Sequence, residues 1–210
     1  MADREGEEMA KILMLRTCNA DMSSYNGFLW PESGPVECPD WDPEPKCGHG
    51  LHGLPWGEGD GVLLNWDLDA KWLVWEAEAS AVVDIGGKSK APKGTVVHCG
   101  DRKSATDFIL ANGGTGKAVV GAVVSAGNHG TATVGDRGTA TAGDRGTATA
   151  GDYGTATAGY GGTATVGEKG RIQVEWWDGE RRRLAVGYVG EDGIEAGKPY
   201  VVVNGKLVTK

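Results

Sequence analysis

The chain has 210 residues, of which 40% are hydrophobic and eight are tryptophan, so it can form a packed core with an appendage and is too apolar for a disordered protein. No stretch approaches the roughly 18 consecutive apolar residues of a membrane-spanning helix. The formal net charge of -8 is unevenly placed, because residues 1–80 hold 16 of the 29 acidic residues and 5 of the 21 basic ones. An acidic surface formed by residues 1–80 would repel nucleic-acid phosphates and could attract basic proteins. The alternative is that this charge only keeps the protein soluble.

The first residues predict a leader with no structural role. Residues 1–8 are acidic where a signal peptide is basic, and the apolar run after them is only a few residues long. We therefore expect a disordered leader and a cytoplasmic protein whose four cysteines stay reduced.

Residues 9–113 predict a mixed α+β domain. The runs at 71–85 and 95–100 have the pattern of strands, while the run at 11–18 fits a strand or a helix. Asp101 is then a helix N-cap in front of a helical stretch that stops at a Gly-Gly pair, which makes this segment the clearest helix of the chain.

From Gly130 the sequence repeats every eight residues. In each octad, Thr-Ala-Thr-Ala/Val is typical of a short strand with alternate side chains on opposite faces, and Gly-Asp-Arg-Gly is typical of a turn whose glycines take positive φ. Because eight residues cannot enclose a core, we expect two octads to form one coil of a narrow β-solenoid over 114–170. A flexible linker is the alternative, but the strict phase and the β-branched threonines favour order.

A 16-residue coil places particular side chains in columns. Asp136, Asp152 and Glu168 would form one column, which costs free energy unless the neighbouring basic column offsets it. The interior would be alanine, which buries little area, so the solenoid needs end caps. Residues 171–210 predict two hairpins, around Asp178-Gly179 and Asn204-Gly205, that can close it. The expected fold is thus an α+β N-terminal domain, a short all-β solenoid and a C-terminal β-hairpin cap.

The octads carry a family resemblance. The phrase AGYGGTAT at 158–165, with GTATAGDR around it, resembles the octapeptide repeat of bacterial ice nucleation proteins. That resemblance implies an ice-binding or water-ordering role for outward Thr-x-Thr arrays, although two to three coils are far too few to template ice unless molecules stack end to end. The candidate threonines are Thr131, Thr133, Thr139, Thr141, Thr147, Thr149, Thr155 and Thr157.

The front half carries a second resemblance. The phrases NGFLWP and VVHCGDRKSAT look like an uncharacterised domain of phage and prophage proteins, which implies a mobile-element context. Together with the acidic charge, this favours a non-enzymatic accessory or anti-defence inhibitor that binds a host protein or nucleoprotein complex. The solenoid would act as a scaffold or as a self-assembly surface of a homo-oligomer, and we expect no cofactor, no membrane contact and no direct nucleic-acid binding. The candidate acidic binding residues are Asp40, Asp42, Glu44, Glu58 and Asp60.

Cysteine and histidine residues between 38 and 52 are weak zinc candidates. Zinc takes four thiolate or imidazole ligands, and Cys47, His49 and His52 on a glycine-rich loop, with Cys38, could supply some of them. No CxxC pair is present, so buried cysteines and polar loop histidines are the favoured interpretation.

A catalytic alternative centres on GHGLHGL at 48–54. An arginine-bearing first strand followed by a Gly-Leu strand resembles ADP-ribosyltransferase-like folds, in which such residues hold a nicotinamide dinucleotide. The resemblance implies roles for Arg16, His52 and Glu76, but the serine-rich strand and acid motif of that fold are not recognisable. The alternative is that the tryptophans form the core with His52 at its margin, and we favour binding over catalysis.

Overall fold

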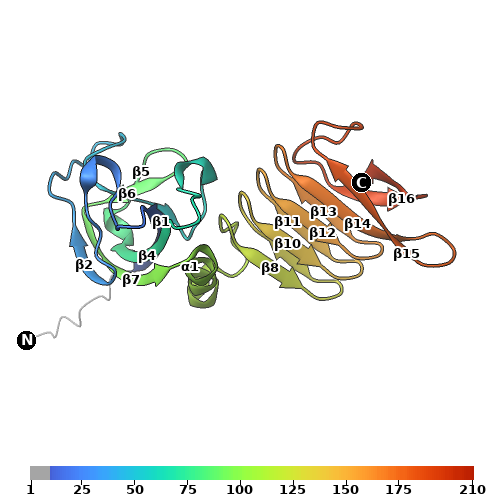
Figure 1. Cartoon of the computed structure of the whole chain (residues 1–210), viewed down its shortest axis with the longest axis horizontal. Helices are drawn as coiled ribbons and strands as arrows, with labels where there is room; N and C mark the ends of the chain where they lie inside the picture. Colours follow the sequence, from blue (N-terminus) through green and yellow to red (C-terminus); the bar gives the residue numbers. More distant parts are fainter. Residues whose placement is uncertain (1–9) are drawn as a thin grey trace, which may run out of the picture.

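The computed structural model describes residues 10–210 and shows an antiparallel sheet domain, a β-solenoid and C-terminal strands, in that order (Figure 1). The expected leader at 1–8 lies outside the described residues. The first sheet has the order β2-β7-β4-β1-β3-β6-β5, and all of its neighbouring strands are antiparallel. Its strands are β1 (Lys11–Cys18), β2 (Gly34–Glu37), β3 (Leu51–Pro55), β4 (Lys71–Glu78), β5 (Val83–Asp84), β6 (Ser89–Ala91) and β7 (Lys93–Gly100).

The long pair β1 and β4 forms the centre of this sheet. All eight residues of β1 pair with β4, so the segment whose pattern fitted either a strand or a helix is a strand. The central strand predicted at the start of the run from residue 71 is β4, which ends at Glu78, and a 3-10 turn comes next at Ala79–Ala81. Short 3-10 turns also occur at Tyr25–Gly27 and Gly61–Leu63.

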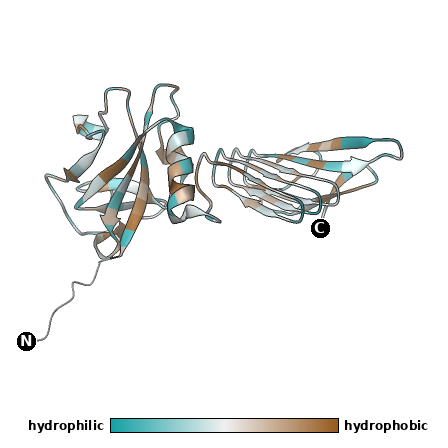
Figure 2. Cartoon of the chain, turned by 90° about the horizontal axis from the view of Figure 1, so that it is seen from below, coloured by the Kyte–Doolittle hydropathy of each residue, from teal (hydrophilic) through white to brown (hydrophobic). Residues whose placement is uncertain are grey.

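The predicted helix is confirmed and joins the two halves of the molecule. Helix α1 (Arg102–Ile109) begins after Asp101, whose carboxylate accepts a hydrogen bond from the amide of Ser104 at 2.7 Å. A π-helical turn at Leu110–Gly114 ends it. In Figure 2 the helix stands between the sheet domain and the solenoid, and it contacts β4 and β7 of the sheet domain.

The octads form a solenoid with two octads per coil, as predicted. Each strand pairs in parallel with the strand 16 residues further on, which gives two sheets, one through β8, β10, β12 and β14 and one through β9, β11 and β13. The degenerate copy before Gly130 supplies β8. The strands are β8 (Val123–Ala126), β9 (Thr131–Thr133), β10 (Thr139–Ala142), β11 (Thr147–Ala150), β12 (Thr155–Ala158) and β13 (Thr163–Val166).

The C-terminal hairpins close the solenoid. Strands β14 (Arg171–Trp177) and β15 (Arg182–Tyr188) extend one sheet, and β16 (Tyr200–Val203) and β17 (Lys206–Thr209) extend the other. Both β15 and β16 run antiparallel to their neighbours, so the parallel stack of coils ends here. Arginines on β15 and lysines on and after β17 place charge along the outermost strands, as is common on exposed sheet edges.

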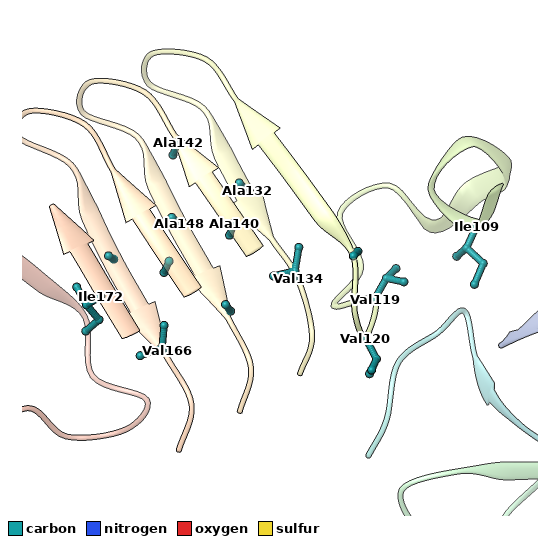
Figure 3. Packing of buried hydrophobic residues seen from close by; sticks show 14 of the residues in the cluster. Ile109, Val119, Val120, Ala132, Val134, Ala140, Ala142, Ala148, Val166 and Ile172 are labelled. Carbon is teal, nitrogen blue, oxygen red and sulfur yellow. The ribbon is translucent and has the colours of Figure 1, made fainter. Parts of the chain in front are cut away.

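The alanines point inward and form one core with the sheet domain. Ala132, Ala140 and Ala148 are completely buried, which confirms the predicted interior. Figure 3 shows larger side chains at both ends of this alanine column: Val119, Val120 and Ile109 on the side of the sheet domain, and Val166 and Ile172 on the other. The small alanines allow the two sheets to approach closely, and bulky residues at the ends exclude water from them.

The corners differ from the predicted turn chemistry. Positive φ angles occur at the residue after the Asp or Asn of each corner, such as Arg137 (53°) and Tyr153 (55°), and among octad glycines only Gly161 has one. The glycines are needed for close approach instead, because a Cβ on Gly146 would lie 2.8 Å from the Cβ of Ala142. The strained corner residues stack their side chains: the Arg137 guanidinium lies 5.2 Å from the Tyr153 ring centre, and Lys169 Nζ donates to Tyr153 Oη at 3.0 Å.

The predicted column of acidic residues is held by backbone amides. Asp136 Oδ1 accepts a hydrogen bond from the amide of Asp152 at 2.9 Å, and Asp152 Oδ1 accepts from the amide of Glu168 at 2.8 Å. The other corner repeats this ladder, with Asn128 accepting from the amide of Asp144 at 2.9 Å. Each carboxylate thus satisfies an amide of the next coil, an attraction that offsets the repulsion between like charges.

This ladder predicts a specific response to substitution. In Asp152→Ala the amide of Glu168 loses its acceptor, and we expect the free energy of unfolding to fall by about 1 kcal/mol. Asp152→Asn is the matched control, because it retains the accepting oxygen and removes a like charge, so its stability should equal or exceed that of the wild type. Urea unfolding followed by circular dichroism measures both, and equal losses in the two variants would contradict the ladder.

Candidate functional site: the threonine faces of the solenoid

The outward threonines form two arrays on opposite sides of the solenoid. The β11 face consists of the threonines of β9, β11 and β13, and the β12 face consists of those of β10 and β12. All eight predicted threonines lie on these faces, four on each. The β11 face also includes Thr163 and Thr165, which the prediction omitted although the fifth octad has the same Thr-Ala-Thr pattern.

Most of these hydroxyl groups have no protein partner among the described residues. Exceptions occur towards the C-terminal end: Thr157 donates to Gln173 Oε1 at 3.1 Å, and Thr155 accepts from Arg171 Nη2 at 3.4 Å. On the β11 face, Thr163 is buried and accepts from Lys210 Nζ at 3.4 Å. The hydroxyls that remain for water are those of Thr131, Thr133, Thr139, Thr141, Thr147, Thr149 and Thr165.

The spacing of the hydroxyls is set by the parallel register. Neighbouring strands of a sheet lie about 4.8 Å apart, and residues i and i+2 of one strand lie about 6.6 Å apart. Because Thr131, Thr147 and Thr163 are paired directly, their side chains form a column at the first spacing. A β-branched side chain has few χ1 rotamers in a strand, so the hydroxyl and methyl groups are held in a regular grid.

The two faces differ in what surrounds the threonines. The β11 face has three consecutive Thr-x-Thr coils, and β16 lies beyond them. Side chains alternate between the two faces of β16, so with Tyr200 buried, Val201 and Val203 point outward. The β12 face has only two, between Val123 and Ser125 of β8 and Arg171 and Gln173 of β14. The β11 face is therefore the longer array without an inserted charged residue.

Each of the predicted acidic residues has a partner within the part of the chain that the structure describes. Asp42 and Asp60 each accept a hydrogen bond from the amide two residues further on, at 3.0 and 2.9 Å. Glu58 accepts from the amide of Ala118 at 2.9 Å, and Asp40 lies 2.8 Å from His49. Glu44 lies 4.0 Å from Lys46. These carboxylates stabilise their own loops and the junction with the solenoid, and binding of a basic host partner through them stays a prediction.

The three residues of the enzyme alternative are only partly brought together. Arg16 Nη1 donates to the backbone oxygen of His52 at 3.4 Å. Arg16 pairs with Leu73 in the register of β1 and β4, so Glu76, three residues further along β4, points to the opposite face of the sheet. There Glu76 forms an ion pair with Lys11 at 2.9 Å.

Three of the zinc candidates make hydrogen bonds within their own loop. Cys38 donates to Asp40 at 3.0 Å, His49 contacts the same carboxylate, and His52 accepts from the amide of Gly48. Cys47 is exposed, and all four cysteines are free thiols. Within residues 10–210 no group of three or more His, Cys, Asp or Glu residues could hold a metal ion, and no helix there is long and apolar enough to cross a bilayer.

Comparison with known proteins gives two kinds of match, one to a domain family and one to ice nucleation proteins. Residues 12–111 match a domain of unknown function, DUF7666. Over 104 residues, 49% of this chain, the sequence is 42% identical to an ice nucleation protein of Xanthomonas campestris pv. translucens, of which the match covers 7%. It is also 42% identical over 102 residues to ice nucleation protein InaU of Pantoea ananas, covering 10% of that protein. About half of the chain is homologous to ice nucleation proteins.

The chain thus spans a tenth or less of the length of these relatives. A third relative, an ice nucleation protein of Pseudomonas fluorescens, is 39% identical over 104 residues and is covered to 9%. No solved structure matches the chain significantly. The predicted resemblance of the octads is confirmed, whereas the phage association of the front domain stays a prediction.

The two sides of strand β11 predict opposite sensitivities to valine. Thr147→Val and Thr149→Val remove hydroxyls that have no protein partner, so each should change the free energy of unfolding by less than about 0.5 kcal/mol. Ala148→Val lies between them but points into the filled core, and overpacking should cost about 1–3 kcal/mol. Urea unfolding of the three variants tests this, and a large loss in the threonine variants would show that the hydroxyls are structural.

Proposed function

We propose that the β11 face binds ice through water held on its threonine grid. The observation that carries the proposal is the regular Thr-x-Thr array of the β11 face, in which every hydroxyl except that of Thr163 has no protein partner among the described residues. The hydroxyl group of each threonine can donate and accept hydrogen bonds, whereas the methyl group of the same side chain cannot. The array therefore offers water molecules a repeated pattern of polar and apolar contacts. The homology of half the chain to ice nucleation proteins supports this proposal over the other functions considered.

The size of the face favours binding to existing ice rather than starting its formation. Three strands at a spacing of about 4.8 Å make each threonine column about 10 Å long. An ice embryo must exceed a critical size before it grows, and so small a face stabilises only a few water molecules. A surface that adsorbs to an ice crystal that is already growing does not have to stabilise an embryo of critical size.

The ends of the solenoid also limit the array. Antiparallel β16 lies next to β13, and β17 lies beyond β16. The sheet domain contacts the other end, where the amide of Gly61 donates to Asp136 Oδ2 at 3.0 Å and the Arg137 guanidinium lies 4.7 Å from the Trp66 ring centre. Adding coils by end-to-end stacking would require these contacts to open. The proposed activity therefore belongs to a single chain and does not need a homo-oligomer.

The proposal predicts thermal hysteresis and inhibition of ice recrystallisation by the purified protein, without a raised freezing temperature of supercooled droplets. Replacing Thr147 and Thr149 together by lysine should abolish both effects, because it puts two charged side chains in the middle of the β11 face. The matched control is the double change Thr139→Lys and Thr141→Lys on the opposite face, which should retain activity.

Three results would count against this proposal. A wild-type protein without thermal hysteresis or recrystallisation inhibition would exclude ice binding. Full activity in the Thr147/Thr149 variant, or loss only in the Thr139/Thr141 variant, would exclude the β11 face as the surface. Circular dichroism of each variant is the control that tests whether the solenoid is still folded.

A further inference from the structure

A pocket of about 1030 Å³ lies in the N-terminal sheet domain beside β1 and β3. This is at the upper end of the size range of small-molecule sites. Its walls combine basic, polar and apolar side chains, among them Arg16, Phe28, Trp30, His52, Leu63 and Lys88. The solenoid threonines take no part in it, so the pocket is independent of the candidate ice-binding face.

The guanidinium of Arg16 is the most unusual group in this pocket. It lies over the Trp30 ring at 3.9 Å and donates long hydrogen bonds to the backbone oxygens of His52 and Thr17, at 3.4 and 3.3 Å. It also interacts with the Cys18 thiol. Its Nε is buried without a hydrogen-bond partner, and no carboxylate of residues 10–210 forms an ion pair with it. A guanidinium has five N–H donors, and a largely desolvated charge without a counter-ion is costly.

The neighbouring groups add positive charge rather than neutralise it. Lys90 is fully buried, and its Nζ donates to the backbone oxygen of Gly48 at 3.1 Å. Burial, together with Lys88, Arg16 and Lys90, lowers the pKa of His52 to about 4, so this imidazole is neutral at pH 7. Burial raises the pKa of the Cys18 thiol, although the neighbouring Arg16 guanidinium acts in the opposite direction, and this thiol is not an ion-pair partner of Arg16 in the way that a carboxylate would be.

The acidic group of the pocket is already engaged. Asp40 lies 2.8 Å from His49 Nδ1 and accepts from Cys38 at 3.0 Å. The pocket thus has an unpaired basic centre inside the half of the chain that is most acidic overall.

We propose that this pocket binds a small molecule through a carboxylate or phosphate group that accepts hydrogen bonds from the Arg16 guanidinium. Trp30 covers one face of the guanidinium and fixes its plane, so the remaining N–H groups form a rigid fork that suits an oxyanion with two oxygens. The apolar part of the ligand lies against Phe28, Leu63 and Leu64, which line the same pocket.

Calorimetric titration with small probes tests this proposal. The anionic probes are inorganic phosphate, adenosine 5′-monophosphate and benzoate, and the uncharged controls are adenosine and benzamide. We expect at least one anionic probe to bind at millimolar concentration and its uncharged counterpart to bind at least about tenfold more weakly. Binding of adenosine monophosphate without benzoate identifies a phosphate ligand, and the reverse identifies a carboxylate.

Substitution of Arg16 tests whether its guanidinium binds the anionic probe. Arg16→Gln should weaken the anionic probe about tenfold or more, and Arg16→Lys should give an intermediate affinity because it retains the charge without the planar fork. Arg181→Gln removes an exposed arginine of the β14–β15 hairpin and should leave the affinity unchanged.

A measurement on the wild-type protein tests the proposal even if the Arg16 variants do not fold. The probe should shift the Arg16 Nε–Hε resonance in a 15N–1H spectrum, whereas a purely structural arginine would not respond. Failure of every anionic probe to bind, equal affinity for the uncharged counterparts, or an unshifted Arg16 resonance with a bound probe would overturn the proposal.

Discussion

The structure depends on one repeated interaction, the parallel pairing of each octad with the octad 16 residues further on. The pairing satisfies the backbone of the strands, and at each corner the Asp or Asn side chain accepts from an amide of the next coil. An alanine interior buries little apolar area and cannot stabilise the solenoid alone. The ladder, the stacked corner side chains and the larger residues at the two ends supply what the alanines do not.

The same register produces the candidate ice-binding surface. Because side chains alternate along a strand, placing alanine inside places threonine outside, and direct pairing aligns Thr131, Thr147 and Thr163 in one column. The contacts that cap the solenoid also determine how long this column is. Relatives of much greater length are homologous to about half of the chain. Under the proposed function, the short array of this chain suits adsorption to ice rather than nucleation of ice.

Much of this architecture could be predicted from the sequence. The eight-residue phase predicted strands and corners, the need to enclose a core predicted two octads per coil, and Asp178-Gly179 and Asn204-Gly205 predicted the hairpins that are observed. Positive φ at Arg137 and Tyr153 was not predictable from propensity, because left-handed backbone is unfavourable for these residue types and the stacking between coils that accompanies it forms only in the folded solenoid. Likewise, the contact of Lys210 with Thr163 joins residues that only the folded hairpin brings together.

The sheet domain shows where sequence reasoning reaches its limit. Grouping Arg16, His52 and Glu76 required the strand register, since a shift of one residue moves a side chain to the other face of the sheet. The observed register puts Arg16 and Glu76 on opposite faces, and it puts Trp30 against the guanidinium, which no local pattern indicated. The unpaired charge of Arg16 is a property of the folded pocket alone.

Amide hydrogen exchange across residues 130–170 tests the central claim most directly. If each coil is hydrogen-bonded to the next, the strand amides and the corner amides of Asp144, Asp152 and Glu168 should be protected as strongly as those of β1 and β4. Rapid exchange throughout the octads while β1 and β4 stay protected would contradict the ordered solenoid and the surface built on it.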